Sequence, residues 1–254
     1  MSAPSPASSS SRPLRPVFLA TMLRYSAVMT KPHPTPDVLS ALPPELSSRL
    51  FAKARTIALS ADETLFLAGD AGDGCYRVEE GLLKASILSP TGSERILAIF
   101  GAGAVIGELS MIDGAPRSAT VTALRDAKLQ FVSRPSFDAF GDDNPDVYKH
   151  MVGLLANRLR DANGALIATS FLSVKGRVAR ALLSLAEAFG RDVGSGRTLV
   201  RQKVTQSDLA AMAGIARENV SRVLQDWMKR KVVSRLAGYY CIEDRPSLTA
   251  EIEV

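Results

Sequence analysis

The order of apolar and polar positions divides the chain into regions of different periodicity. Residues 55–136 hold short β-type runs, LFLAG, CYRVEEG, LLKASIL, RILAIFG, ATVTAL and KLQFVS. Glycine and aspartate separate these runs at intervals of about 8 to 12 residues. This spacing is typical of an antiparallel barrel or sandwich, and we expect six separate short strands.

Residues 145–172 change to a helical period. Their apolar side chains recur at steps of three and four residues, at Met151, Leu155, Leu159, Ala162 and Leu166. A single helix of this length leaves its apolar side uncovered. Its length and its place between two domains favour a homodimer interface.

Two helices with a tight turn between them are predicted from VTQSDLAAMAGIARENVSRVLQDWMKRKVV. Thr205 and Asp208 form a candidate capping box, and Gly214 supplies the turn. The second helix has a buried stripe at Val220, Val223, Leu224 and Trp227. The run SRLAGYYCIEDR then indicates a two-stranded wing with Gly238 at its turn. The pattern is that of a winged helix-turn-helix.

The polar side of the second helix carries the candidate DNA-reading residues Arg217, Glu218, Ser221 and Arg222. Arginine suits guanine and glutamate suits cytosine at base edges in the major groove. The distribution of charge also supports DNA as the partner. Residues 173–254 hold 14 Lys and Arg against 9 Asp and Glu, whereas the remaining residues hold 17 of each. We therefore expect this part of the chain to bind double-stranded DNA.

A second motif, GAVIGELSMIDGAPRSATV, covers residues 103–121. Gly107 permits close approach of a ligand, and the N–H groups following Glu108, at Leu109 and Ser110, begin a short helix that favours a phosphate oxygen. Arg117 supplies a permanent positive charge, with the Ser118 hydroxyl beside it. Glu108 can accept a hydrogen bond from a ribose hydroxyl, so a cyclic nucleotide, which has both groups, is the candidate ligand.

With both motifs in this order, residues from about 37 to 245 resemble the cyclic-AMP receptor protein family of the Crp/Fnr superfamily. The resemblance implies a homodimer that is switched by a cyclic nucleotide, binds palindromic TGTGA-like sites and contacts RNA polymerase. Where family members place threonine and serine against the purine, this chain has Ala162 and Asn163. Asn163 can serve adenine or guanine, so cyclic AMP is the first choice of effector and cyclic GMP the alternative.

Other classes of function find less support in the sequence. The only histidines, His33 and His150, make no convincing catalytic group, and neither an enzyme nor a metal site is expected. Cys75 leaves open a haem-sensing or ligand-independent regulator of the same family. No apolar run is long enough to span a membrane, and a cytoplasmic location is expected.

These patterns predict an α+β protein with four parts. Residues 1–35, rich in Ser, Pro and Ala, are expected to be a disordered leader, with Met1, Met22 and Met29 as possible starts. An antiparallel jelly-roll barrel that binds the cyclic nucleotide follows at residues 36–143, opening on a helix that begins near Pro36-Asp37 and includes Pro44. The dimerisation helix covers residues 144–172, and the winged helix-turn-helix covers residues 173–254.

Overall fold

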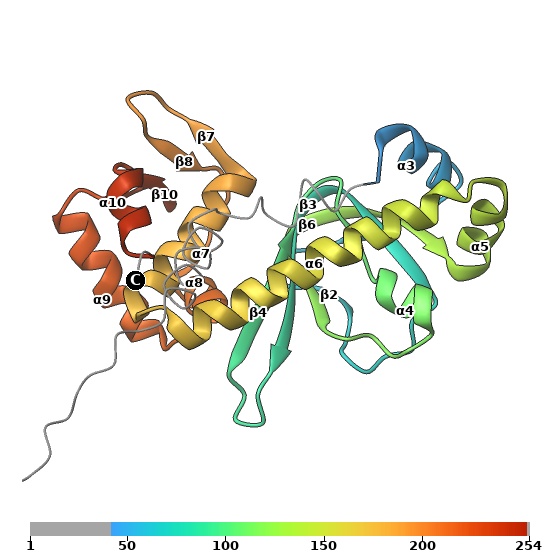
Figure 1. Ribbon diagram of the computed structural model, residues 1–254, viewed down its shortest axis with the longest axis horizontal. Helices are drawn as coiled ribbons and strands as arrows, with labels where there is room; N and C mark the ends of the chain where they lie inside the picture. Colours follow the sequence, from blue (N-terminus) through green and yellow to red (C-terminus); the bar gives the residue numbers. More distant parts are fainter. Residues whose placement is uncertain (1–41, 253–254) are drawn as a thin grey trace, which may run out of the picture.

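The computed structural model describes residues 42–252 of the 254-residue chain. The predicted leader, the alternative starts Met22 and Met29, and the helix start near Pro36-Asp37 lie outside the described residues. An antiparallel sheet domain and a mainly helical domain are joined by one long helix (Figure 1). This arrangement confirms the predicted α+β class.

The first domain is built on a sheet that the described residues form with six strands. They are β1 (Arg55–Leu59), β2 (Thr64–Phe66), β3 (Gly74–Leu88), β4 (Glu94–Phe100), β5 (Val105–Ile106) and β6 (Thr120–Ser133). Strand β6 pairs with β1, β2 and β3, while β3 also pairs with β4 and β5. All of these pairings are antiparallel.

Two of the strand breaks expected from the sequence are wrong. CYRVEEG and LLKASIL form the single strand β3, and ATVTAL and KLQFVS form the single strand β6. The pairing of β3 with β6 shifts register between Val78 and Leu83 instead of ending there. Gly81 has φ 99°, and a Cβ on it would lie 2.5 Å from the Cα of Ala127. This glycine therefore marks an irregularity inside a strand, where two backbones approach closely.

Apolar side chains fill the space inside the curved sheet and beneath its helices. Leu83, Phe100, Val121 and Leu129 lie in the inner cluster. A second cluster joins the sheet to α3 (Pro44–Leu50), to α5 (Arg134–Asp143) and to the first turns of α6 (Asp146–Phe171). Pro44 lies in the first turn of α3, as predicted, where its missing N–H leaves no bond unmade.

The long helix α6 begins two residues after the predicted start at 144 and ends one residue before the predicted end at 172. Met151 and Leu154 are buried against the sheet domain. Val152, Leu159 and Leu166 follow one another at seven-residue steps and are 65%, 63% and 67% exposed. The predicted seam is therefore wrong for Met151 and Leu155, which pack in the core of the sheet domain, whereas Leu159 and Leu166 lie on an uncovered apolar face.

The second domain combines four helices with a small four-stranded sheet among the described residues. Its elements are α7 (Val174–Phe189), β7 (Gly190–Asp192), β8 (Thr198–Val200), α8 (Gln206–Ala213), α9 (Arg217–Lys229), β9 (Val233–Leu236), β10 (Tyr239–Ile242) and α10 (Arg245–Ala250). The capping box is confirmed, since Thr205 and Asp208 each accept a hydrogen bond from the other's backbone N–H. The α9 stripe is buried as predicted, with Trp227 fully enclosed. Gly238, with φ 89°, lies in the turn of the β9–β10 wing.

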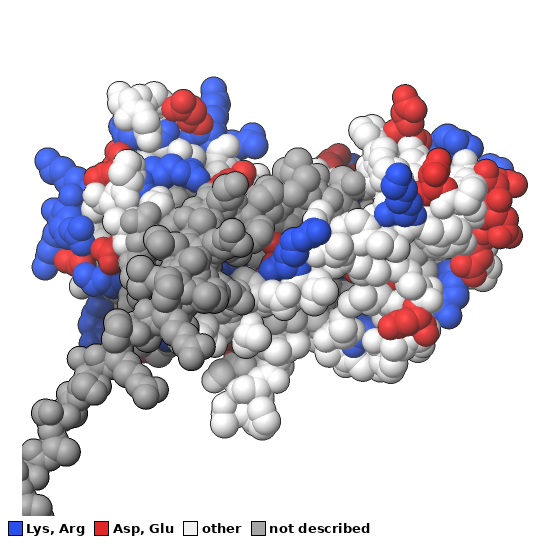
Figure 2. Space-filling model, viewed as in Figure 1, with Lys and Arg blue, Asp and Glu red and all other residues white. Residues whose placement is uncertain are grey.

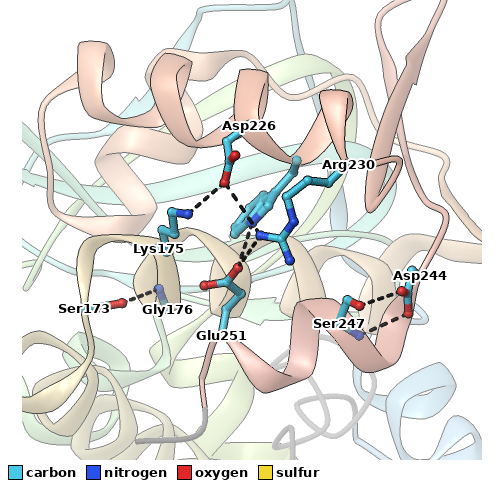
Figure 3. A network of polar contacts seen from close by, with 9 residues as sticks. Ser173, Lys175, Gly176, Asp226, Arg230, Asp244, Ser247 and Glu251 are labelled. Carbon is cyan, nitrogen blue, oxygen red and sulfur yellow. Dashed lines mark hydrogen bonds and ion pairs between the residues drawn. The ribbon is translucent and has the colours of Figure 1, made fainter.

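Ion pairs join α9 to the start of α7, and Arg230 directly after α9 to Glu251 (Figure 3). Asp226 on α9 pairs with Lys175 at 2.7 Å and with Arg230 at 3.6 Å. Glu251 accepts hydrogen bonds from the Trp227 indole and from Arg230, both at 3.2 Å. Helix α9 is thereby connected to the first turn of α7, which follows directly on α6.

Within residues 42–252, α6 and the shorter helices all lack the combination of length and apolar content that a bilayer crossing requires.

Candidate functional site

A glycine turn and a short helix form one wall of the predicted ligand site. Gly107 has φ 80° and immediately precedes α4 (Glu108–Asp113). A Cβ on Gly107 would lie 2.5 Å from Nη1 of Arg117. The left-handed backbone and this close contact both require glycine, because its missing side chain makes room for the arginine.

Arg117 is 4% exposed and is held rigidly. Its Nη1 donates to the carbonyl oxygens of Gly74 and Gly107, at 2.9 and 2.8 Å, and its Nη2 lies 3.4 Å from the Asp73 carboxylate. The guanidinium carbon lies 4.4 Å from the centre of the Phe66 ring. Its Nε is buried and has no partner among the described residues. One donor of a fixed, buried cation is thus left for an anionic ligand.

Glu108 lies on the same wall and is fully buried. One of its carboxylate oxygens accepts a hydrogen bond from Arg158 of α6, which also donates to the carbonyl of Val105. The other oxygen, Oε2, is buried without a partner among residues 42–252. Burying a carboxylate oxygen without a hydrogen-bond donor is unfavourable in free energy. A ligand hydroxyl would supply the missing donor.

One cavity is lined by most of the predicted ligand-binding residues. Its lining includes six of them, Gly107, Glu108, Leu109, Ser110, Arg117 and Ser118. The remaining wall is mostly apolar, and it is formed by Phe66, Ala85, Phe100, Ile106, Ala119 and Val121 together with Arg158. A cavity lined by a cation, a carboxylate and apolar groups that include two aromatic rings fits a phosphate, a sugar and a base.

Asn163, the remaining predicted ligand residue, is not brought into this cavity. It is exposed on α6, where it lies between Leu159 and Leu166 in the sequence. The side chain therefore belongs to the uncovered side of the helix. Any contact it makes with a ligand must come from a rearrangement or from a second copy of the chain.

Arg158 was not identified from the sequence, although a signal was present. Val147, Met151 and Leu154 form the buried side of α6, and Arg158 is the next residue at that spacing. A charged residue on a buried helical side needs a partner, which here is Glu108, 50 residues earlier in the chain.

The predicted DNA-reading residues lie together on one side of α9. Arg217, Glu218 and Arg222 are exposed, and Ser221 is half-buried. Lys and Arg side chains gather at the end of the molecule that carries α9 (Figure 2), where Lys229, Arg230 and Lys231 are also exposed. This surface can present side chains to base edges and positive charge to phosphates.

Cys75, the residue behind the haem-sensing alternative, lies elsewhere. It is buried in the cluster beneath α3, α5 and α6 and does not line the ligand cavity. Burial raises the pKa of its thiol to about 12. The protonated, enclosed thiol gives that alternative no support.

Comparison with known proteins identifies relatives for both domains. Residues 56–144 match the cyclic nucleotide-binding domain, and residues 176–251 match the Crp-like helix-turn-helix domain. A CRP-like cAMP-activated global transcriptional regulator of Mycobacterium tuberculosis is 31% identical over 79% of this chain and 89% of its own length. A cyclic AMP receptor protein of Thermus thermophilus is 36% identical over 66% of this chain and 74% of its own length.

Solved structures share the fold at lower identity. FixK2 of Bradyrhizobium japonicum superposes with a TM-score of 0.70 at 20% identity, over 78% of this chain and 96% of its own. A transcriptional regulator of the CRP/FNR family from Thermus thermophilus gives 0.65 at 24% identity, over 79% of this chain and 99% of its own. The order of domains described above is therefore that of a known architecture.

Proposed function

Since the chain belongs to the Crp/Fnr family of transcription regulators, which are not enzymes, we propose that it is a homodimer switched by cyclic AMP. The nucleotide binds the cavity of the sheet domain, and α9 of each copy reads one half of a palindromic TGTGA-like site. RNA polymerase is the expected protein partner of the DNA-bound dimer.

The observation that carries this proposal is that two residues lining one cavity each have a buried polar atom without a hydrogen-bond partner among the described residues. Arg117 Nε is a donor on a fixed cation, and Glu108 Oε2 is an acceptor on a buried carboxylate. A cyclic nucleotide offers a singly charged phosphate to the first and a ribose 2′-hydroxyl to the second. A simple anion would leave Glu108 unpaired, and a neutral sugar would leave Arg117 unpaired.

The choice of cyclic AMP rests on the relatives, two of which are named for cyclic AMP. Cyclic GMP carries the same sugar and phosphate, so the atoms just described would hold either nucleotide. Dimerisation is supported by the exposed apolar face of α6, where Val152, Leu159 and Leu166 are spaced as in a helix–helix seam.

The proposal is tested by fluorescence anisotropy on a labelled TGTGA palindrome at one fixed salt concentration. Protein is titrated alone, with cyclic AMP and with cyclic GMP. We expect tight binding with cyclic AMP only, and its loss in Arg117→Leu. Arg49→Leu, which removes an exposed arginine of α3, is the matched control. Equal binding with and without nucleotide would refute the switch, and tighter binding with cyclic GMP would change the effector.

A further inference from the structure

The outer face of the antiparallel sheet carries an apolar patch that the interior of the sheet domain does not use. Leu82, Ile96 and Ile99 are 0%, 4% and 7% exposed and belong to the same cluster as the core of the second domain. Leu124 packs against that cluster. The outer face of an antiparallel sheet is commonly polar because water covers it. The apolar side chains of this patch must therefore pack against another part of the protein.

A bulge in β4 turns two isoleucines toward this outer face. Three residues apart on a regular strand, Ile96 and Ile99 would point to opposite faces. Ala98 pairs with Ala85, however, and Ile96 pairs with Ser86, so that Leu97 is an extra residue in β4. Both isoleucines consequently share a face, while Phe100 points into the sheet domain.

The helix-turn-helix covers the patch. Helix α8 lies against β4 (Figure 1), and Met212 and Ile215 pack against the shared cluster. The contact extends to the turn before the recognition helix, where the Arg95 guanidinium occupies the space that a side chain on Gly214 would need. The DNA-reading module therefore rests directly on strand β4.

The same strand reaches the ligand cavity. Phe100, at the end of β4, lines the cavity, and its ring lies 5.3 Å from the Arg158 guanidinium. Phe100 and Ile99 are neighbours on opposite faces of one strand. A ligand that shifts the backbone at Phe100 also moves Ile99, because one peptide bond joins the two residues.

We propose that β4 couples the ligand cavity to the DNA-reading module, with Ile96 and Ile99 as positioning residues that carry displacements of Phe100 to α8. The inference rests on the proposed function, since it concerns how nucleotide binding changes DNA binding. It requires no contact of Ile96 or Ile99 with nucleotide or DNA.

The test compares Ile96→Ser and Ile99→Ser with Leu97→Ser, which lies on the same strand and is 54% exposed. Anisotropy gives the Kd for the TGTGA duplex without nucleotide and with saturating cyclic AMP, and the ratio of the two is the coupling factor. Calorimetry gives the Kd for cyclic AMP. We expect both isoleucine variants to lower the coupling factor by about fivefold or more, and Leu97→Ser to leave it within about twofold.

An unchanged coupling factor in folded isoleucine variants would overturn the inference. Circular dichroism and thermal melting establish that the variants are folded. Arg95→Gln, which removes the guanidinium over Gly214, provides a second variant with the apolar patch intact, and it should lower the coupling factor by more than the Leu97→Ser control does. A coupling factor of one in the wild-type protein would be a failure of the proposed function itself, and it would be seen before any variant is made.

Discussion

Replacing Glu108 by glutamine should change how the protein distinguishes cyclic AMP from 2′-deoxy cyclic AMP. Glu108 is fully buried, with one oxygen bound by Arg158 and the other, Oε2, without a partner among the described residues. If the ribose 2′-hydroxyl donates to Oε2, removing that hydroxyl leaves the carboxylate oxygen unsatisfied. Glutamine has nearly the same shape and retains an acceptor, but it lacks the charge.

The size of the effect follows from the charge on the acceptor. A hydrogen bond to a charged group contributes about 1.5–3 kcal/mol, and a neutral one about 0.5–1.5 kcal/mol. The wild-type protein should therefore bind cyclic AMP about 13- to 160-fold more tightly than the deoxy nucleotide. In Glu108→Gln the preference should fall to about 2- to 13-fold. The ratio of these ratios isolates the contact, because effects on overall affinity cancel.

Isothermal titration calorimetry of both proteins with both nucleotides completes the cycle. Thermal melting must accompany it, since weakening the pair with Arg158 also affects stability. Glutamine is preferred to alanine for the same reason, because removing one member of a buried ion pair costs about 3–5 kcal/mol. An equal preference for cyclic AMP in the wild-type protein and in the variant would refute the assignment of Glu108 to the ribose.

Three further predictions concern the DNA-reading surface, the α6 seam and the buried Cys75 thiol. Arg217→Ala should weaken binding to the TGTGA duplex by about 1–3 kcal/mol in anisotropy, and an equal loss on unrelated DNA would argue against base reading. Leu159→Asp with Leu166→Asp should shift sedimentation toward the monomer, and an unchanged profile would argue against the α6 seam. Burial raises the pKa of Cys75 from 9.0 to about 12, so iodoacetamide should label it at pH 8 only after unfolding. Its contribution to stability is complete below pH 9 and is lost as the pH rises toward 12; rapid labelling of the native protein would contradict this.

Features determined by neighbouring residues were predictable from the sequence. The capping box of Thr205 and Asp208 spans three residues, and the buried stripe on α9 spans two helical turns. Gly107 and Arg117 lie ten residues apart, on either side of α4. The physical requirement in each case is a cap, an apolar side or a close approach. Each acts within a short segment, so the residue types in that segment indicate it.

Features that depend on pairing between distant segments were not predictable. Gly81 was interpreted as a break because glycine commonly ends a strand, whereas the long partner β6 carries β3 through it. The outward direction of Ile96 depends on a bulge that the register with β3 imposes. Arg158 reaches Glu108 across 50 residues. One-residue changes of register reverse the face of every later side chain, and no local pattern records them.

Helix α6 carries, on neighbouring residues, a side chain of the ligand cavity and a side chain of the exposed apolar face. Arg158 points to Glu108, while the next residue, Leu159, is 63% exposed on the apolar face. Successive residues of an α-helix are about 100° apart around its axis, so these two side chains turn together. A ligand that moves this part of α6 through the Arg158–Glu108 contact also moves the row that contains Leu159 and Leu166. Because Asn163 lies between these two leucines, a partner helix packed on that row would meet Asn163 as well. Effector binding and dimer geometry are therefore expected to change together, without any additional contact between the two sites.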